Sequence, residues 1–172
     1  MDIVSIDWLE KNLNNDDIII LDCSWHLPNT NRSGEKEFLS ERIPGAIFFN
    51  IDDISDPKSL YPHMLPNEKE FSLKVGKLGI SNEHHIITYD TLGIFSSARV
   101  YWMFKQYGHK RISILNGGLK FWKLKNKKLE TTNPTKKESA SYHAQLDRSK
   151  IKKFEDIKKN LESKKFKLID AR

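Results

Sequence analysis

The sequence predicts an α/β fold in which helices cover both faces of a parallel β-sheet. Three observations support this class: four short β-rich apolar runs, helical periodicity between them, and glycines where the helical segments end or begin. The 172 residues, 38% hydrophobic and 30% charged, are typical of a globular protein with one substantial core and some chain left over.

The four predicted strands are nearly continuous apolar runs, as expected of strands that are covered on both faces. They are residues 18–23 (IIILDC), 46–49 (AIFF), 86–89 (IITY) and 112–115 (ISIL).

The predicted helices occupy residues 68–78, 97–107 and 119–125. In the second of them, Val100, Phe104 and Tyr107 recur on one face of a 3.6-residue period. Gly108 is placed to stop this helix, and Gly117–Gly118 is predicted to form a tight turn that leads into the third helix.

The character of the chain changes after Lys125. Residues 126–150 are polar, contain Pro134 and have no period, which predicts an extended linker on the surface. Helical spacing resumes over residues 151–161, and residues 166–170 are predicted to form another strand. We therefore expect a first domain over residues 1–125, a linker over 126–150 and the start of a truncated second domain over 151–172.

An internal repeat supports the second domain. Without gaps, the alignment pairs Ser5 with Lys153, Ile6 with Phe154, Leu9 with Ile157, Leu13 with Leu161 and Asp22 with Asp170. A repeat at this distance has the length of a domain, so the fold is predicted to begin again near residue 150. The alternative is a chance match of two helix–strand units.

The net charge of +6 is concentrated at the C-terminal end, where residues 123–172 hold 16 Lys and Arg against 7 Asp and Glu. These lysines are not interleaved with aromatic residues, so a solvated surface is favoured over nucleic-acid binding. No apolar run approaches the roughly 20 residues that span a bilayer, and the N-terminus lacks a leader pattern. The lone cysteine favours a reducing, cytoplasmic compartment.

A strand, a glycine-containing loop and a helix N-terminus follow one another over residues 86–97 (IITYDTLGIFSS). Such a loop gathers backbone N–H groups around one point and favours an anion, for example a cysteine thiolate of lowered pKa. The residue at the head of this loop is Asp90, so we expect a carboxylate to occupy the cradle, with Arg99 as its counter-charge. The alternative is that Asp90 only caps the following turn.

Asp52 and His63 form a second candidate cluster. Pro62 and Pro66 restrict the backbone around His63, as suits a held side chain. A carboxylate bonded to one imidazole nitrogen would fix the tautomer and leave the other nitrogen to act as a base. The alternative is an ordinary surface histidine.

Cys23 follows the first predicted strand, and His26 lies three residues further on. A histidine at this distance could activate a nucleophilic thiol. We favour instead a small buried residue at the end of a strand.

Seven segments resemble the tandem rhodanese sulfurtransferases, most of all the mercaptopyruvate sulfurtransferases. They are residues 21–28 (LDCSWHLP), 42–49 (RIPGAIFF), 62–66 (PHMLP), 95–104 (FSSARVYWMF), 115–118 (LNGG), 145–147 (QLD) and 168–172 (LIDAR). The resemblance covers nearly the whole chain and leaves mercaptopyruvate and thiosulfate as alternative sulfur donors.

The resemblance implies two rhodanese domains, with the catalytic cysteine in the second and an aspartate, here Asp90, in the equivalent loop of the first. It further implies that Asp52 and His63 belong to a Ser–His–Asp arrangement at the domain interface, and that Phe95 faces this site. Cys23 stands where an alanine is common. The arginines that bind the substrate carboxylate are expected just beyond residue 172.

The function implied is sulfur transfer through a cysteine persulfide, and this chain alone is expected to be inactive. The implied partners are a second rhodanese domain in cis or in trans, a small-molecule sulfur donor and a thiol acceptor such as thioredoxin. Cyanide is a further possible acceptor. We expect no cofactor and no metal. The alternative is a non-catalytic binding or regulatory module.

Overall fold

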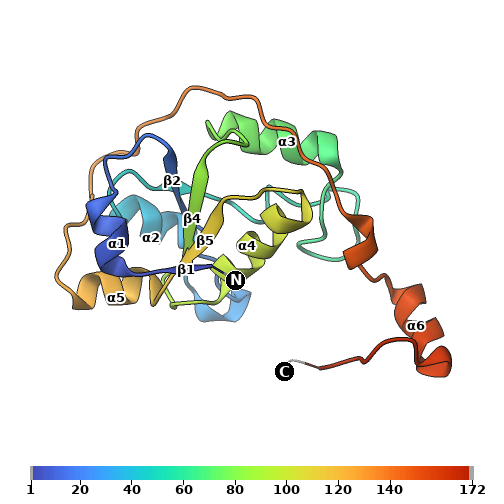
Figure 1. Ribbon diagram of the computed structural model, residues 1–172. Helices are drawn as coiled ribbons and strands as arrows, with labels where there is room; N and C mark the ends of the chain where they lie inside the picture. Colours follow the sequence, from blue (N-terminus) through green and yellow to red (C-terminus); the bar gives the residue numbers. More distant parts are fainter. Residues whose placement is uncertain (1, 171–172) are drawn as a thin grey trace.

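A five-stranded, fully parallel sheet lies at the centre of the molecule (Figure 1). Its strands follow the order β1-β5-β4-β2-β3. The computed structural model describes residues 2–170. The strands are β1 (Ile3–Val4), β2 (Ile18–Asp22), β3 (Ile47–Phe48), β4 (His85–Tyr89) and β5 (Ile112–Leu115). The four predicted strands are confirmed, and the two-residue edge strand β1 is an addition to the prediction.

Helices cover both faces of this sheet. One hydrophobic cluster contains residues of α1 (Ile6–Lys11), α2 (Gly34–Ser40) and α5 (Gly118–Leu124). The other contains residues of α3 (Glu68–Lys77) and α4 (Ser96–Gln106). The predicted α/β class with helices on both faces is therefore confirmed, although α2 was not anticipated.

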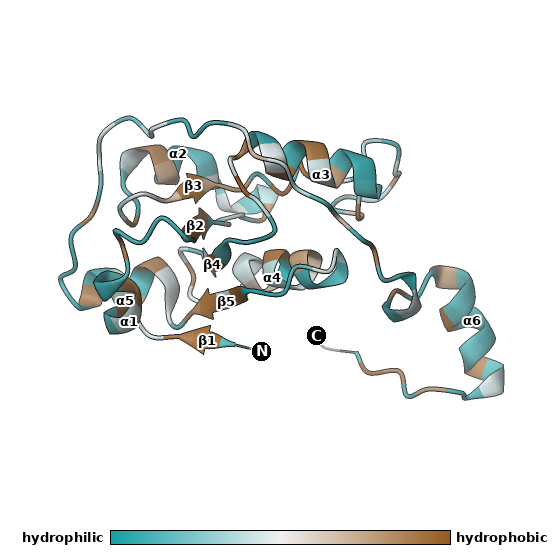
Figure 2. Cartoon of the chain, turned by 45° about the horizontal axis from the view of Figure 1, so that its top comes forward, coloured by the Kyte–Doolittle hydropathy of each residue, from teal (hydrophilic) through white to brown (hydrophobic). Residues whose placement is uncertain are grey.

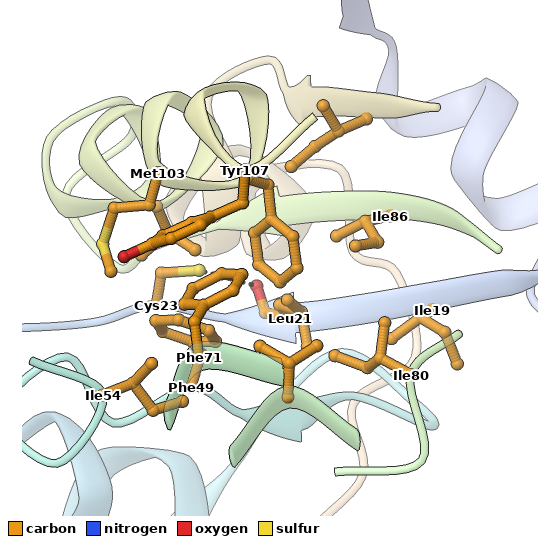
Figure 3. Packing of buried hydrophobic residues seen from close by; sticks show 14 of the residues in the cluster. Ile19, Leu21, Cys23, Phe49, Ile54, Phe71, Ile80, Ile86, Met103 and Tyr107 are labelled. Carbon is orange, nitrogen blue, oxygen red and sulfur yellow. Dashed lines mark hydrogen bonds between the residues drawn. The ribbon is translucent and has the colours of Figure 1, made fainter. Parts of the chain in front are cut away.

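The interior strand β2, which lies between β4 and β3, divides the core into these two clusters. Successive side chains of a strand point to opposite faces, so Ile18 and Ile20 enter one cluster while Ile19 and Leu21 enter the other. All five residues of β2 are buried. Figure 3 shows the second cluster, where Cys23 lies among aromatic side chains that include Phe71.

The linker is attached to the domain. It runs back across the surface past α3 (Figure 1), and the backbone N–H of Ala140 donates to the carbonyl of Gly76 over 2.9 Å. A Cβ on Gly76 would lie 2.5 Å from the Ala140 oxygen, so only glycine permits this approach. Tyr142 is 4% exposed and extends the core beyond the helices and strands.

The last helix, α6 (Phe154–Ser163), stands apart from the sheet (Figure 1). Its N-cap is Lys153, and the N-cap of α1 is Ser5, so both helices begin at aligned positions of the repeat. Their environments differ, because Leu9 of α1 is fully buried whereas Leu161 of α6 is 65% exposed. The apolar positions of α6 are visible among its polar residues in Figure 2.

The prediction of a strand over residues 166–170 is wrong for the described structure. No element is assigned there, and Ile169 is 82% exposed. A strand needs a hydrogen-bonded neighbour, and no strand of the described sheet lies alongside this segment. The end of the quoted 168–172 motif lies outside the described residues. Within residues 2–170, none of the helices has the length and apolar character needed to cross a membrane.

Candidate active site

The Asp90 carboxylate lies in a cradle of hydrogen-bond donors at the carboxyl end of β4. Its Oδ1 accepts from the backbone N–H groups of Leu92 (2.9 Å) and Gly93 (2.8 Å). Its Oδ2 accepts from the N–H groups of Phe95 (2.8 Å) and Ser97 (2.9 Å) and from the Ser97 hydroxyl (2.5 Å). Asp90 is 1% exposed, so these five donors take the place of water.

This arrangement contains more than a turn cap. The bonds to Leu92 and Gly93 follow the local pattern of an aspartate that caps a turn. The bonds to Phe95 and Ser97 reach the beginning of α4, where the helix dipole also favours a negative charge. We call this loop of residues 90–97, which surrounds the carboxylate with N–H groups, the nest.

A glycine at the start of α5 packs against the backbone of the nest. Gly118 has a φ of +54°, and a Cβ at this position would lie 2.3 Å from the Asp90 carbonyl oxygen. The same oxygen accepts the N–H of Leu119 over 3.0 Å. The predicted Gly117–Gly118 turn therefore allows the start of α5 to approach the loop closely.

A second buried carboxyl, Asp22, ends the neighbouring strand β2. Its Oδ1 accepts the N–H of Ser24 over 2.9 Å, while Oδ2 has no hydrogen-bond partner among the described residues. Burial, assisted by the nearby Asp90 charge, raises the pKa of Asp22 to about 6. The hydroxyl of Ser24 in turn accepts the N–H of Thr91, so the end of β2 supports the nest loop.

The structure brings Asp52 and His63 together. The Asp52 Oδ1 and His63 Nε2 atoms are 2.6 Å apart, which leaves Nδ1 as the second ring nitrogen. The indole of Trp25 meets the imidazole edge-on, with the ring centroids 4.9 Å apart. The Asp52 side chain is 65% exposed and that of His63 is 22% exposed, so the pair lies at an accessible surface.

Trp25 and Asp52 also line a polar cavity of about 210 Å³. Ser24 and Asn50 contribute to its wall. Because the hydroxyl of Ser24 also bonds the nest loop, this cavity lies beside both candidate clusters.

Exposed apolar side chains surround the candidate site. Phe95 is 49% exposed, although its backbone N–H is bonded to Asp90. Further exposed apolar residues lie in the nest and in the loop of His63: Leu92, Ile94, Leu60, Tyr61 and Met64. We call these six residues the apolar rim. Apolar groups gathered around polar ones are typical of interaction sites.

Cys23 lies away from this surface. Its thiol is fully buried and donates to the carbonyl of Leu21 over 3.5 Å. Burial, together with the charges of Asp22 and Asp90, raises the pKa of Cys23 well above its ordinary value. His26 contacts Glu37 over 2.9 Å instead of the thiol. The thiol therefore lacks the exposure and the activating partner that a nucleophile needs.

The predicted pairing of Arg99 with Asp90 is wrong. Among the described residues no hydrogen bond or ion pair joins the two, and the guanidinium donates to the His63 carbonyl instead, over 2.7 Å. The sequence analysis also missed Ser97, which bonds the carboxylate twice. A serine in the first turn of a helix that follows an anion-binding loop is the signal that could have identified it.

None of the described residues forms a group of three or more His, Cys, Asp or Glu side chains that could hold a metal ion.

Comparisons with known proteins agree with this architecture. Residues 5–125 match the rhodanese-like domain. The chain belongs to the rhodanese-like domain family. It is 43% identical to thiosulfate sulfurtransferase of Bos taurus and 40% identical to 3-mercaptopyruvate sulfurtransferase of Homo sapiens, in each case over 99% of this chain. It spans 59% of the length of both relatives.

Solved structures give the same result. The rhodanese-fold 3-mercaptopyruvate sulfotransferase SseA from Escherichia coli superposes with a TM-score of 0.92 at 32% identity, covering 99% of this chain and 65% of that one. Tum1 from Saccharomyces cerevisiae superposes with a TM-score of 0.86 at 30% identity, covering 100% of this chain and 60% of that one. Both structures therefore share the fold of this chain over nearly its whole length.

Proposed function

We propose that this chain is the non-nucleophilic part of a sulfurtransferase. In this proposal a second rhodanese domain supplies a cysteine that takes sulfur from a donor, mercaptopyruvate or thiosulfate, and passes it to an acceptor. A thiol such as that of thioredoxin, or cyanide, serves as acceptor. The chain contributes one wall of the site, formed by the nest, the Asp52–His63 pair and Phe95.

The observation that carries the proposal is the carboxylate in the nest. A rhodanese-type nest can stabilise a thiolate and its persulfide through N–H groups and a helix dipole. Here Asp90 occupies this position with five hydrogen bonds, and carboxylate oxygens cannot carry sulfane sulfur. The one cysteine, Cys23, is buried elsewhere. A nucleophilic sulfur must therefore come from another domain.

The Asp52–His63 pair suits proton transfer beside that sulfur. When a thiolate attacks mercaptopyruvate, an S–S bond forms, the carbon–sulfur bond of the donor breaks, and pyruvate leaves as its enolate. The proton lost by the donor thiol must finally reach the enolate carbon. A histidine whose Nε2 is bonded to a carboxylate keeps Nδ1 available to take up and return a proton.

A complementation assay tests the proposal. The chain, a separately produced cysteine-bearing rhodanese domain, and their mixture are each supplied with mercaptopyruvate or thiosulfate and with cyanide, and thiocyanate is measured. We expect no turnover from the chain alone, and turnover in the mixture that exceeds that of the cysteine-bearing domain. His63→Ala in the chain should lower this gain at least tenfold. The matched control is His143→Ala, at an exposed linker histidine, which should leave it unchanged.

Turnover by the chain alone that disappears in Cys23→Ser would refute the proposal. Association of the two domains without any gain in turnover would favour the alternative of a binding or regulatory module, which the exposed apolar rim also suits. If the domains bind and turnover rises but His63→Ala has no effect, Asp52 and His63 have no part in the chemistry.

A further inference from the structure

Arg99 makes a contact that the proposed proton transfer does not yet explain. It belongs to the first turn of α4, and its Nη2 donates to the backbone carbonyl oxygen of His63 over 2.7 Å. The guanidinium lies over the Trp102 ring, 4.5 Å from the centroid, so its direction is fixed from a second side. These two contacts fix the position of the guanidinium, although no carboxylate among the described residues is bonded to it.

The carbonyl that receives this bond belongs to a residue with unfavourable backbone geometry. His63 has a φ of +57°, in the left-handed region of the backbone that residues other than glycine rarely adopt. Such a conformation persists only where surrounding contacts hold it. The loop has two further anchors: the carbonyl of Met64 accepts the N–H of Asp56 over 2.8 Å, and that of Pro66 accepts the Tyr107 hydroxyl over 2.5 Å.

The bond to Asp52 alone is a weak means of fixing the imidazole. The Asp52 side chain is 65% exposed, and ion pairs at exposed positions contribute little because water and salt screen them. Trp25 packs edge-on against the imidazole, and the direction of the ring otherwise depends on the backbone that carries it. Arg99 is the side chain that bonds this backbone at His63 itself.

The same helical turn holds the nest. Ser97 bonds Asp90 through both its N–H and its hydroxyl, and Arg99 follows two residues later. Residues two positions apart point in different directions from a helix, so one turn can contact the nest on one side and the His63 loop on another. The first turn of α4 is therefore a rigid connection between the two halves of the candidate site.

We propose that Arg99 is a positioning residue, which holds the left-handed backbone of His63 and thereby directs the imidazole relative to the nest. The proposal deepens the proposed function and rests on it for its catalytic meaning. Its structural content stands alone, because it concerns contacts within this chain. Among the described residues Arg99 makes no hydrogen bond to the Asp90 carboxylate, so its proposed effect on the site acts through His63.

The first test uses the chain alone and nitrogen-15 NMR of the imidazole groups. In the native chain we expect His63 to show one predominant neutral tautomer, with the proton on the Nε2 that faces Asp52. Arg99→Met keeps an apolar stem over Trp102 and removes the donors, and should give a mixture of tautomers. The matched control Arg111→Met removes another arginine-to-carbonyl bond, from Arg111 Nη1 to the Glu83 oxygen (2.8 Å), and should leave the His63 signals unchanged.

The second test measures kinetics in the complemented mixture. Because misplacement of a catalytic group lowers the rate more than it lowers substrate binding, Arg99→Met should reduce kcat at least tenfold and change KM for the donor less than twofold. Arg99→Lys keeps a donor at the end of a long stem and should recover part of the loss. If Arg99→Met does not fold, the NMR and kinetic measurements are made on Arg99→Lys instead.

An unchanged His63 tautomer in Arg99→Met, or equal effects of Arg99→Met and Arg111→Met, would overturn the proposal. So would a folded Arg99→Lys that loses as much kcat as Arg99→Met, because the contact requires a donor. If the mixture shows no turnover while the NMR result holds, the proposed function fails and the structural role of Arg99 remains. The two failures are therefore distinguishable.

Discussion

Replacing the carboxylate of Asp90 by an amide should destabilise the protein. In Asp90→Asn one oxygen becomes an NH₂ group. If it replaces Oδ1, the N–H groups of Leu92 and Gly93 face a donor; if it replaces Oδ2, those of Phe95 and Ser97 do. Each unsatisfied buried donor costs about 1–3 kcal/mol. Because the loop is partly exposed and water can reach some of these groups, we expect a loss of about 2–4 kcal/mol.

The assay is urea unfolding followed by tryptophan fluorescence, with amide hydrogen exchange of residues 92–97 as a local probe. The matched control is Asp56→Asn. Asp56 accepts one N–H, from Lys58, through Oδ1 in an exposed turn, and asparagine keeps this bond. The control should change stability by less than about 0.5 kcal/mol. If Asp90→Asn equals this control and the loop amides exchange at the native rate, the carboxylate does not organise the nest.

Three further predictions follow from buried groups. The pKa of Asp22 rises from 3.8 to about 6 on folding, because burial disfavours the carboxylate. Its contribution to the free energy of unfolding is therefore fully present below about pH 4 and is lost as pH rises through 6. Asp22→Asn should remove this dependence and raise the free energy of unfolding at pH 7.5 by up to about 3 kcal/mol. If the urea midpoint of the variant shifts between pH 4 and 7.5 as much as that of the native chain does, the prediction is contradicted. Tyr142→Ala should cost about 3 kcal/mol in thermal unfolding and expose the linker to protease, whereas Tyr61→Ala, at a side chain that is 73% exposed in the native chain, should do neither. Cys23 should react with iodoacetamide only in the unfolded chain, and rapid labelling of the native chain would show that its burial is wrong.

The main strands and helices could be predicted from the sequence because each carries an apolar run or a helical spacing long enough to recognise. Residues 86–89 and 112–115 carry mainly apolar side chains on both faces of the strand, which is typical of a covered parallel sheet. The missed elements are short or mostly polar. Strand β1 has two residues, and α2 has the sequence GEKEFLS, in which Phe38 is the one large buried side chain. Neither provides a period that distinguishes it from a loop.

The errors have physical causes. The segment 166–170 has the composition of a strand, but strand formation depends on a partner, which composition does not specify. Arg99 follows Asp90 closely in sequence, yet its place on α4 directs it to the His63 loop, while Ser97 meets the carboxylate. The sequence position of Arg99 indicated the correct turn of the helix but the wrong side chain. Successive side chains of a helix point in directions about 100° apart, so residues of one turn contact different neighbours.

The attachment of the linker also determines how freely α6 can move. The N–H of Asp147 donates to the Gln106 carbonyl over 2.9 Å, a short 3₁₀ turn covers Arg148–Lys150, and α6 begins at Phe154. The pivot is therefore confined to residues 151–153, at the end of α4. A body tethered so closely explores a small volume and meets its docking surface at an effective concentration on the order of millimolar. A unit attached to α6 would therefore lose little orientational entropy on docking against this domain.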